Sequence, residues 1–329
     1  MTPNINEISK KLITCIRIDD SWINRHLTSH GVLKNDHKVI FRAYTVSFSG
    51  TTQELDGMIH YFASQIDKFL FSDKESEEFK KTGQQPLLHA LKSFGGYTDP
   101  LKDGKYGELV LFLLVESILK VPMIAHKIST LSNENDQVKG GDGIFLGLYE
   151  GVPSILIGES KIYQKRADAM EQALVSLNKF HSENSGGKIF RELLVAQKNI
   201  SNDFEKDELE YLYKCLSQGS DEYKQCNKVH PVLIIYDDNK INNFETQCKN
   251  KDEGESLMKQ HMQSELNSIR TLFESKMENY PEIKKHYVDV FFIPLKDVNF
   301  FRNRFYFVLH GMNYLDLNKK KKRYHGKNI

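Results

Sequence analysis

Hydrophobic and polar positions in the first hundred residues follow two different periods. Apolar residues spaced three or four apart predict a helix over 53–71, whose apolar face carries Leu55, Ile59, Phe62, Ile66 and Phe69. Runs rich in β-branched and aromatic residues predict short strands over 12–18 and 38–49. The polar and charged stretch over 73–85 predicts a loop or an exposed helix, and it marks a candidate boundary.

A helix, three strands and a second helix are predicted next along the chain. The stretch over 107–120 is apolar nearly all round, as buried helices are, and Pro122 ends it. The three strands are predicted over 121–129, 141–149 and 153–161. The turn-forming pair Glu150-Gly151 separates the last two strands, and an amphipathic helix over 165–183 follows them.

The C-terminal half combines charged helices with buried strands. Residues 188–227 are highly charged and predict helices. Continuous apolar runs that begin at His230 and His286 predict two buried strands. A long polar helix over 254–280 is predicted between these strands, and a final helix after the second.

The composition is that of an ordinary soluble globular protein, with 40% hydrophobic and 27% charged residues. The longest purely apolar run, Leu109 to Val115, has seven residues, whereas a membrane span needs about 20. The first residues lack the apolar stretch of a signal peptide, so we expect a cytoplasmic protein with no membrane partner. A net charge of +1 is lower than that of many dedicated DNA-binding proteins, but it does not exclude an enzyme that touches DNA briefly.

Several common functional motifs are absent from the sequence. There is no GxxxxGK[ST] loop, so we expect no ATP-driven motor of that type. A GxGxxG after a strand and a GxSxG elbow are also missing. The four cysteines are scattered without a CxxC pair, which predicts reduced thiols rather than a zinc site.

The strongest candidate chemistry lies at Glu159 and Lys161. These residues sit two apart at the end of an apolar strand, so both side chains point to one face. The bare ExK pattern occurs five times in the chain, but the other four lie in charged, helix-like or loop-like stretches. The alternative is a surface ion pair on an edge strand, which would contribute little to stability.

Asp142 follows two glycines at the start of the preceding strand. In a hairpin about Glu150-Gly151, Asp142 and Glu159 stand at similar distances from the turn and come close together. Two such carboxylates repel each other unless one is protonated or a cation lies between them. Their oxygen atoms suit Mg²⁺, which can polarise a phosphoryl oxygen and supply hydroxide, while a nearby lysine stabilises the transition state. The alternative for Asp142 is a turn residue beside glycine.

Glu108 opens the buried helix and supplies a third carboxylate, which could reach the same ion or hold its water. The alternative is a glutamate that merely complements the dipole of the first helical turn. An acid on a helix, an acid on a strand, and then an acid with a lysine on the next strand form a more specific pattern than each residue alone.

This arrangement resembles the PD-(D/E)XK nuclease superfamily, whose restriction-endonuclease-like core runs helix, three strands, helix, strand. The family's acid, acid and ExK positions match Glu108, Asp142 and Glu159-Ser160-Lys161, with Gly-Asp where the family usually has Pro-Asp. The resemblance implies that Glu108, Asp142, Glu159 and Lys161 are catalytic. It implies that Mg²⁺ or Mn²⁺ is bound by Asp142, Glu159, Glu108 and the main-chain carbonyl of Ser160.

Four stretches within 105–180 carry a narrower resemblance: GELVLFLLVE, IAHKIS, GGDGIFLG and ILIGESK. They resemble the HamA nuclease subunit of the Hachiman antiphage defence system, and the related Abp abortive-infection nuclease subunit is similar. The resemblance implies a bacterial defence nuclease that cleaves DNA together with a superfamily 2 helicase on another chain. It also implies that Lys127, Gln164 and Lys165 line the DNA path, the alternative being solvated surface residues.

The sequence therefore predicts an α/β fold with a restriction-endonuclease-like core, in which helices flank a mixed central sheet. An N-terminal α+β region over 1–96 precedes a nuclease domain over 97–329, which carries a helical insertion at about 188–228. The predicted function is Mg²⁺-dependent DNA cleavage in antiphage defence. Two alternatives stay open. One is a catalytically inactive subunit of this fold that only binds nucleic acid or assembles with the helicase. The other is a ribonuclease, which the same site could support.

Overall fold

The computed structural model describes residues 5–34, 38–94, 98–125, 142–181, 188–198, 200 and 204–314. Within these residues, eight strands form one mixed sheet in the order β1-β2-β10-β9-β7-β6-β5, and β8 pairs with β9. The strands are β1 (Leu27–Lys34), β2 (Val39–Val46), β5 (Met123–Ala125), β6 (Ile144–Tyr149), β7 (Val152–Ile157), β8 (Glu159–Tyr163), β9 (Asn227–Asp237) and β10 (Tyr287–Leu295). A small separate sheet pairs β3 (Phe48–Ser49) with β4 (Thr52–Gln53).

The middle of the main sheet is parallel and its margins are antiparallel. β10 runs parallel to β2 and β9, and β7 and β8 each run parallel to β9. The pairs β1–β2, β6–β7 and β5–β6 are antiparallel. The continuous apolar runs of β9 and β10 agree with their central position, where helices cover both faces.

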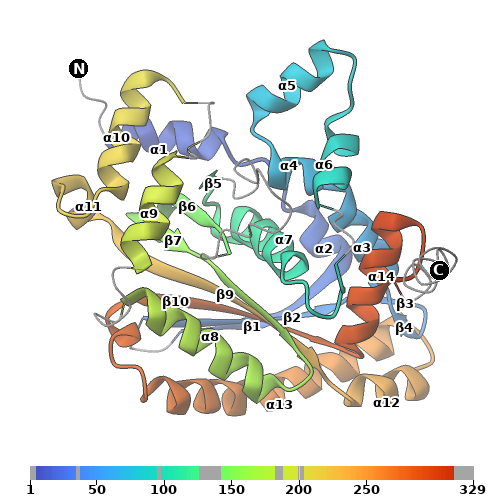
Figure 1. Cartoon of the computed structure of the whole chain (residues 1–329). Helices are drawn as coiled ribbons and strands as arrows, with labels where there is room; N and C mark the ends of the chain where they lie inside the picture. The colour runs from blue at the N-terminus through green and yellow to red at the C-terminus, as the bar shows by residue number, and fades with distance from the viewer. Residues whose placement is uncertain are drawn as a thin grey trace, which may run out of the picture.

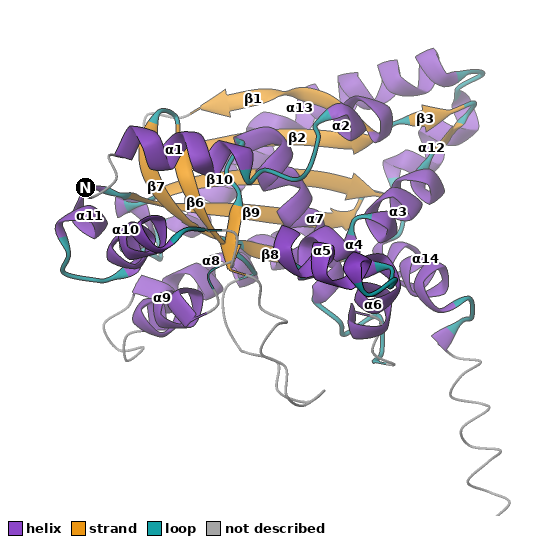
Figure 2. Cartoon of the chain, turned by 90° about the horizontal axis from the view of Figure 1, so that it is seen from above, coloured by secondary structure: helices purple, strands orange, loops and turns teal. Residues whose placement is uncertain are grey.

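Helices cover both faces of this sheet, as Figure 1 shows. In that view α8 and α13 lie below the sheet, and α3, α7 and α14 lie above it. Seen from above, α9, α10 and α11 gather at the end of the molecule where β6 and β7 meet (Figure 2). The first seven helices are α1 (Ile5–Thr14), α2 (Ser21–His26), α3 (Leu55–Ser64), α4 (Ile66–Leu70), α5 (Asp73–Lys81), α6 (Pro86–Phe94) and α7 (Lys105–Leu114), which continues as a π-helical turn, η1 (Val115–Leu119). The others are α8 (Arg166–His181), α9 (Lys188–Lys198), α10 (Lys206–Leu216), α11 (Asp221–Gln225), α12 (Lys240–Gln247), α13 (Lys251–Met277), the 3₁₀ turn η4 (Ile283–Lys285) and α14 (Val298–His310).

Each face of the sheet carries its own hydrophobic core. Alternate residues of β9 divide between the two cores. Val232 and Ile234 join the core that contains α8 and α13, whereas Leu233 and Ile235 join the core that contains α7 and α14. None of the helices in the part of the chain that the structure describes is long and apolar enough to span a membrane.

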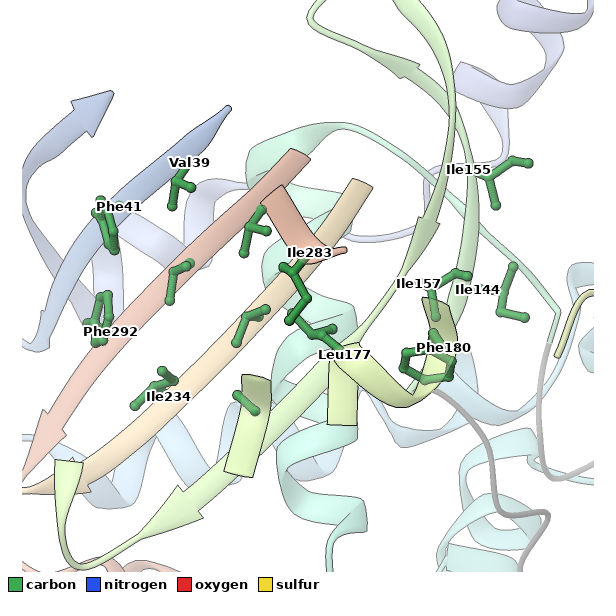
Figure 3. Close-up of a cluster of buried hydrophobic side chains, with 14 of the residues drawn as sticks. Val39, Phe41, Ile144, Ile155, Ile157, Leu177, Phe180, Ile234, Ile283 and Phe292 are labelled. Atoms are coloured by element: carbon green, nitrogen blue, oxygen red, sulfur yellow. The ribbon is translucent and has the colours of Figure 1, made fainter. Parts of the chain in front are cut away.

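The core between α8 and the sheet extends to Ile144 at the start of β6 and Ile157 at the end of β7. Figure 3 shows Phe180 of α8 beside Ile144 and Ile157, and Leu177 nearer to the central strands. The predicted amphipathic helix over 165–183 is therefore confirmed as α8, and its buried residues include Leu177 and Phe180. This packing fixes α8 against the β6–β7 hairpin, whose open end lies beside Asp142 and Glu159.

The predicted order of helix, three strands, helix and strand is present as α7, β5, β6, β7 with β8, α8 and β9. The fold is a mixed α/β sheet flanked by helices, as the sequence predicts. The charged stretch over 188–227 forms α9, α10 and α11 between α8 and β9. The predicted boundary near residue 97 falls between strands of one sheet. β2 belongs to the predicted N-terminal region and pairs with β10 of the predicted nuclease domain. The polar stretch after residue 72 forms the exposed helix α5, which has no buried residue.

The predicted strand over 12–18 is wrong, because α1 occupies this segment as far as Thr14. Ile8 and Leu12 lie one helical turn apart and are both buried, whereas Ile13 is exposed. Four-residue spacing therefore decides the local structure, although the β-branched residues favour a strand.

The predicted buried helix over 107–120 is confirmed, and its last turn is held by Glu116. This carboxylate is fully buried and accepts N–H hydrogen bonds from Arg17 at 2.9 Å, Ile18 at 3.2 Å and Met123 at 3.1 Å. Burial raises the pKa of Glu116. The three bonds tie the segment after α1 to the start of β5 across the end of α7.

Candidate active site

The predicted hairpin between β6 and β7 is confirmed. Glu150 and Gly151 both have positive φ, at 49° and 79°, as the two central residues of a type I′ turn require. The ladder then runs in register to the pair formed by Ile144 and Ile157. This register fixes which residues face each other beyond the ladder.

Asp142 and Glu159 lie two positions beyond the Ile144–Ile157 pair, after Gly143 and Gly158. The N–H of Asp142 donates to the carbonyl oxygen of Gly158 at 2.8 Å, and the N–H of Gly158 donates to the carbonyl oxygen of Gly143 at 2.9 Å. The backbones thus stay paired up to the two acids. The hairpin brings the two predicted carboxylates together, as the sequence predicts.

The sheet forks at Gly158. β7 pairs with both β6 and β9, whereas β8, which begins at Glu159, pairs with β9 among the described strands. The predicted strand over 153–161 is present as β7 and β8, which meet at Gly158 and keep one register against β9, with Leu156 opposite Val229 and Glu159 opposite Val232. A Cβ on Gly158 would lie 2.8 Å from Cδ2 of Leu111, so only glycine lets α7 pack against the fork without displacement.

Ser160 holds the Asp142 carboxylate in place. Both the main-chain N–H and the hydroxyl of Ser160 donate to Oδ2 of Asp142 at 2.6 Å. On its other side Ser160 meets the first turn of α7, where a Cβ on Gly107 would lie 2.7 Å from its Oγ. Gly107 therefore permits the close approach that places α7 beside the two strands.

Glu159 is almost fully buried, with 5% of its surface exposed. It forms an ion pair with Lys161 and lies within electrostatic reach of the Ser176 hydroxyl of α8. Burial, and next the negative charge of Asp142, raise the pKa of Glu159 to about 7, although Lys161 and Ser176 oppose the rise. A buried glutamate with so high a pKa is typical of a functional site.

Lys161 lies beside Glu159 on the same face of β8, because the two pair in register with Val232 and Ile234. Burial would lower the pKa of Lys161, but the carboxylates of Glu159 and Asp142 outweigh this effect and the pKa is raised. The ammonium group is therefore charged at neutral pH. A surface ion pair, the alternative for these two residues, does not describe side chains this deeply buried.

Glu108 lies half-buried in the first turn of α7, directly after Gly107. Among the described residues, no three His, Cys, Asp or Glu side chains form a group that could hold a metal ion, so Glu108, Asp142 and Glu159 do not form one. A contribution from Glu108 to metal binding, like that from the carbonyl oxygen of Ser160, stays a prediction.

The structure describes two of the three residues that are predicted to contact nucleic acid. Gln164 and Lys165 are exposed at the junction of β8 and α8, where the carbonyl oxygen of Gln164 accepts the N–H of Asp237 at 3.2 Å. Their side chains therefore stand in solvent a few residues beyond Lys161. Lys127 lies outside the described residues.

Two serine side chains at the site were not predicted from the sequence. The hydroxyl of Ser160 holds Asp142, and Ser176 of α8 lies near enough to Glu159 to lower its pKa. Ser160 lies inside the ExK motif, so its position was known but its hydroxyl contact was not. Ser176 belongs to no motif, and only the packing of α8 on the sheet brings it to the site.

A protein-family model described as HamA matches residues 17–309, a range that contains every residue of the candidate site. No curated protein matches the chain. The match spans the sheet, the fork between β6 and β8, and the helices on both faces. The chain therefore belongs to the HamA family, a component of the Hachiman antiphage defence system.

Proposed function

We propose that this chain is a metal-dependent nuclease that cleaves DNA phosphodiester bonds as the effector of a Hachiman defence system. The observation that carries the proposal is the buried group at the fork, where Asp142 and Glu159 approach each other and Lys161 lies against Glu159. Burying the Glu159 carboxylate beside a half-buried acid and a half-buried lysine is costly unless these charges are paired or bind an ion. Phosphodiester hydrolysis at a divalent cation uses these residue types.

The donor set fits a divalent cation. Burial, and next the repulsion from Asp142, raise the pKa of Glu159, and a cation between the two carboxylates would relieve the repulsion. Carboxylate oxygens are the ligands that Mg²⁺ and Mn²⁺ prefer. Asp142 and Glu159 would hold the ion, with the carbonyl oxygen of Ser160 as the resemblance implies. When bound, the ion would polarise the phosphate and lower the pKa of a water molecule.

The protein's own groups complete the site. Ser160 orients Asp142 through two hydrogen bonds, and Ser176 of α8 favours the charged form of Glu159. Lys161 provides a fixed positive charge where the phosphoryl transition state gathers negative charge. The surrounding apolar core limits water around these groups, so their electrostatic effect is stronger than it would be at the surface.

The partner we propose is a superfamily 2 helicase on another chain. Membership of the HamA family supports a role inside a Hachiman system, and the absence of a GxxxxGK[ST] loop agrees with a motor on a separate polypeptide. The purified chain alone should therefore hydrolyse no ATP, and it should co-purify with the helicase encoded beside it.

Incubation with supercoiled plasmid tests the function. The chain is assayed alone and with the neighbouring helicase, in Mg²⁺, Mn²⁺, Ca²⁺ or EDTA. We expect nicking or linearisation with Mg²⁺ or Mn²⁺ and binding without cleavage in Ca²⁺. Absence of cleavage under every condition contradicts the proposal, as does full cleavage in EDTA with metal shown to be absent.

A binding measurement tests the metal independently of activity. Mg²⁺ should raise the melting temperature of the wild type, since a ligand at one hundred times its Kd stabilises the folded state by about 2.7 kcal/mol. The Asp142→Asn variant should lose this response. An equal Mg²⁺ response in both proteins would place the ion elsewhere.

A further inference from the structure

Three alternate residues of β8, Glu159, Lys161 and Tyr163, point to one face of the strand. Their exposure increases in that order. Glu159 is 5% exposed, the side chain of Lys161 is 19% exposed, and Tyr163 is 38% exposed. The row therefore leads from the buried acid to solvent, and Tyr163 is its most exposed member.

Tyr163 also lies near two cations. Lys161 is the preceding residue on the same face of β8. Burial lowers the pKa of Arg302 and Tyr163 opposes this lowering, so it lies within electrostatic reach of that residue too. Arg302 is fixed by donating to the carbonyl oxygens of Leu101 at 2.6 Å and Ile162 at 3.0 Å.

The ring of Tyr163 has no structural task that the described residues reveal. Within the described part of the chain it takes part in no aromatic stack, cation–π contact or hydrogen bond, unlike Tyr149, which donates to Asp289 at 2.9 Å. A large ring beside positive charge at the exposed end of this row matches the combination by which proteins hold single strands. Aromatic rings stack on bases, and cations attract the backbone.

We propose that Tyr163 is the residue on which a nucleobase next to the scissile phosphate stacks, and that the site therefore takes DNA strands whose bases are unpaired. The inference rests on the function proposed above and names its substrate class. In a duplex both faces of a base are covered by its neighbours, so a base can reach the Tyr163 ring only after it leaves the stack. Duplex DNA would then become a substrate where it is frayed or unwound.

Fluorescence anisotropy with a short fluorescein-labelled oligothymidylate tests this inference. Binding is measured for the full chain in Ca²⁺, beside a duplex of the same length. Tyr163→Ala should weaken binding of the single strand by roughly 5- to 150-fold, the range that base–aromatic stacking supplies. Tyr163→Phe keeps the ring and should bind within about twofold of the wild type. Tyr213→Ala is the matched control, because Tyr213 is exposed to a similar degree, 42%, but lies on another element. It belongs to α10, which Figure 2 shows beside the β6–β7 hairpin, and not to β8.

An oligonucleotide of abasic sites identifies the contact as ring against base. The wild type should bind it more weakly than oligothymidylate, whereas Tyr163→Ala should bind both alike. The inference is overturned by unchanged single-strand binding in Tyr163→Ala, by an equal loss in Tyr163→Phe or Tyr213→Ala, or by preference of the wild type for the duplex. Failure here with intact plasmid cleavage leaves the nuclease proposal standing. Ring-dependent binding without any cleavage contradicts the nuclease proposal instead.

Discussion

Glu159→Gln should make the metal-free protein more stable at neutral pH than the wild type. Burial, and then the charge of Asp142, raise the pKa of Glu159 from its ordinary value of 4.5 to about 7. Because the pKa is raised on folding, the stabilisation from this carboxyl group is complete below pH 4.5 and is lost as the pH rises through 7. At about 1.36 kcal/mol per pH unit, the loss reaches about 3 kcal/mol by pH 8. Glutamine resembles the neutral acid and does not ionise, so the variant avoids the loss.

Chemical denaturation in EDTA measures this effect. The unfolding free energies of the two proteins should be similar near pH 4.5, and the variant should gain about 3 kcal/mol on the wild type by pH 8. In thermal melting this corresponds to about 4 °C for a chain of this length. Glu171→Gln is the control with the opposite sign, because Lys276, and next Tyr280, lower the pKa of Glu171. A difference between Glu159→Gln and wild type that stays constant from pH 4.5 to 8 refutes the reasoning.

Three further predictions concern packing and buried polar groups. Acid should destabilise the protein through three histidines that contact one another, and the effect is tested in Glu159→Gln because Glu159 itself has the opposite pH dependence. Burial lowers the pKa of His181 to about 2, of His230 to about 4 and of His286 to about 4. Stabilisation present above pH 6.5 should be lost toward pH 4, by about 3 kcal/mol or more in denaturation curves, and constant stability over this range contradicts it. Gly107→Ala should lower both the melting temperature and cleavage, because the new methyl group displaces Ser160. Adding Ser160→Gly to this variant should restore the melting temperature. A melting temperature that does not recover would show that the strain lies elsewhere. Glu116→Ala should cost about 3 kcal/mol in denaturation because two buried N–H groups and one part-buried N–H group lose their acceptor. A change below about 1 kcal/mol would show that water replaces the carboxylate.

The β6–β7 hairpin could be predicted because its signals are local. Glu150 and Gly151 supply the turn, and the apolar runs on either side define the strands. Once the turn is fixed, register alone brings Asp142 to Glu159. The buried environment of Lys161 also follows from the apolar strand that precedes it. These parts of the candidate site needed no information from distant segments.

Other parts depend on distant contacts that no local pattern records. The segment over 12–18 carries β-branched residues, yet Ile8 and Leu12 form a helix because the core beside β6 accepts their shared face. β1 was not predicted, because its alternation is weak and its pairing with β2 supplies the order. Ser176 reaches the site only through the packing of α8. A hydroxyl on a helix looks the same in sequence whether it meets solvent or a buried acid.

Plasmid nicking by site variants tests most directly whether the group of Asp142, Glu159 and Lys161 at the Gly158 fork is a nuclease active site. Asp142→Asn, Glu159→Gln and Lys161→Ala are assayed in complex with the helicase, with melting temperature and co-elution as checks of folding and assembly. Lys34→Ala is the matched control, because Lys34 forms an exposed ion pair with Glu150 at the turn of the same hairpin.

We expect each of the three site variants to lose cleavage while it folds and assembles. For Lys161→Ala the loss should be about 10²- to 10³-fold, the effect of removing one preorganised charge from a transition state. Lys34→Ala should nick at the wild-type rate. If the folded Glu159→Gln and Lys161→Ala variants also nick at the wild-type rate, the active site does not lie at this fork and the account is contradicted.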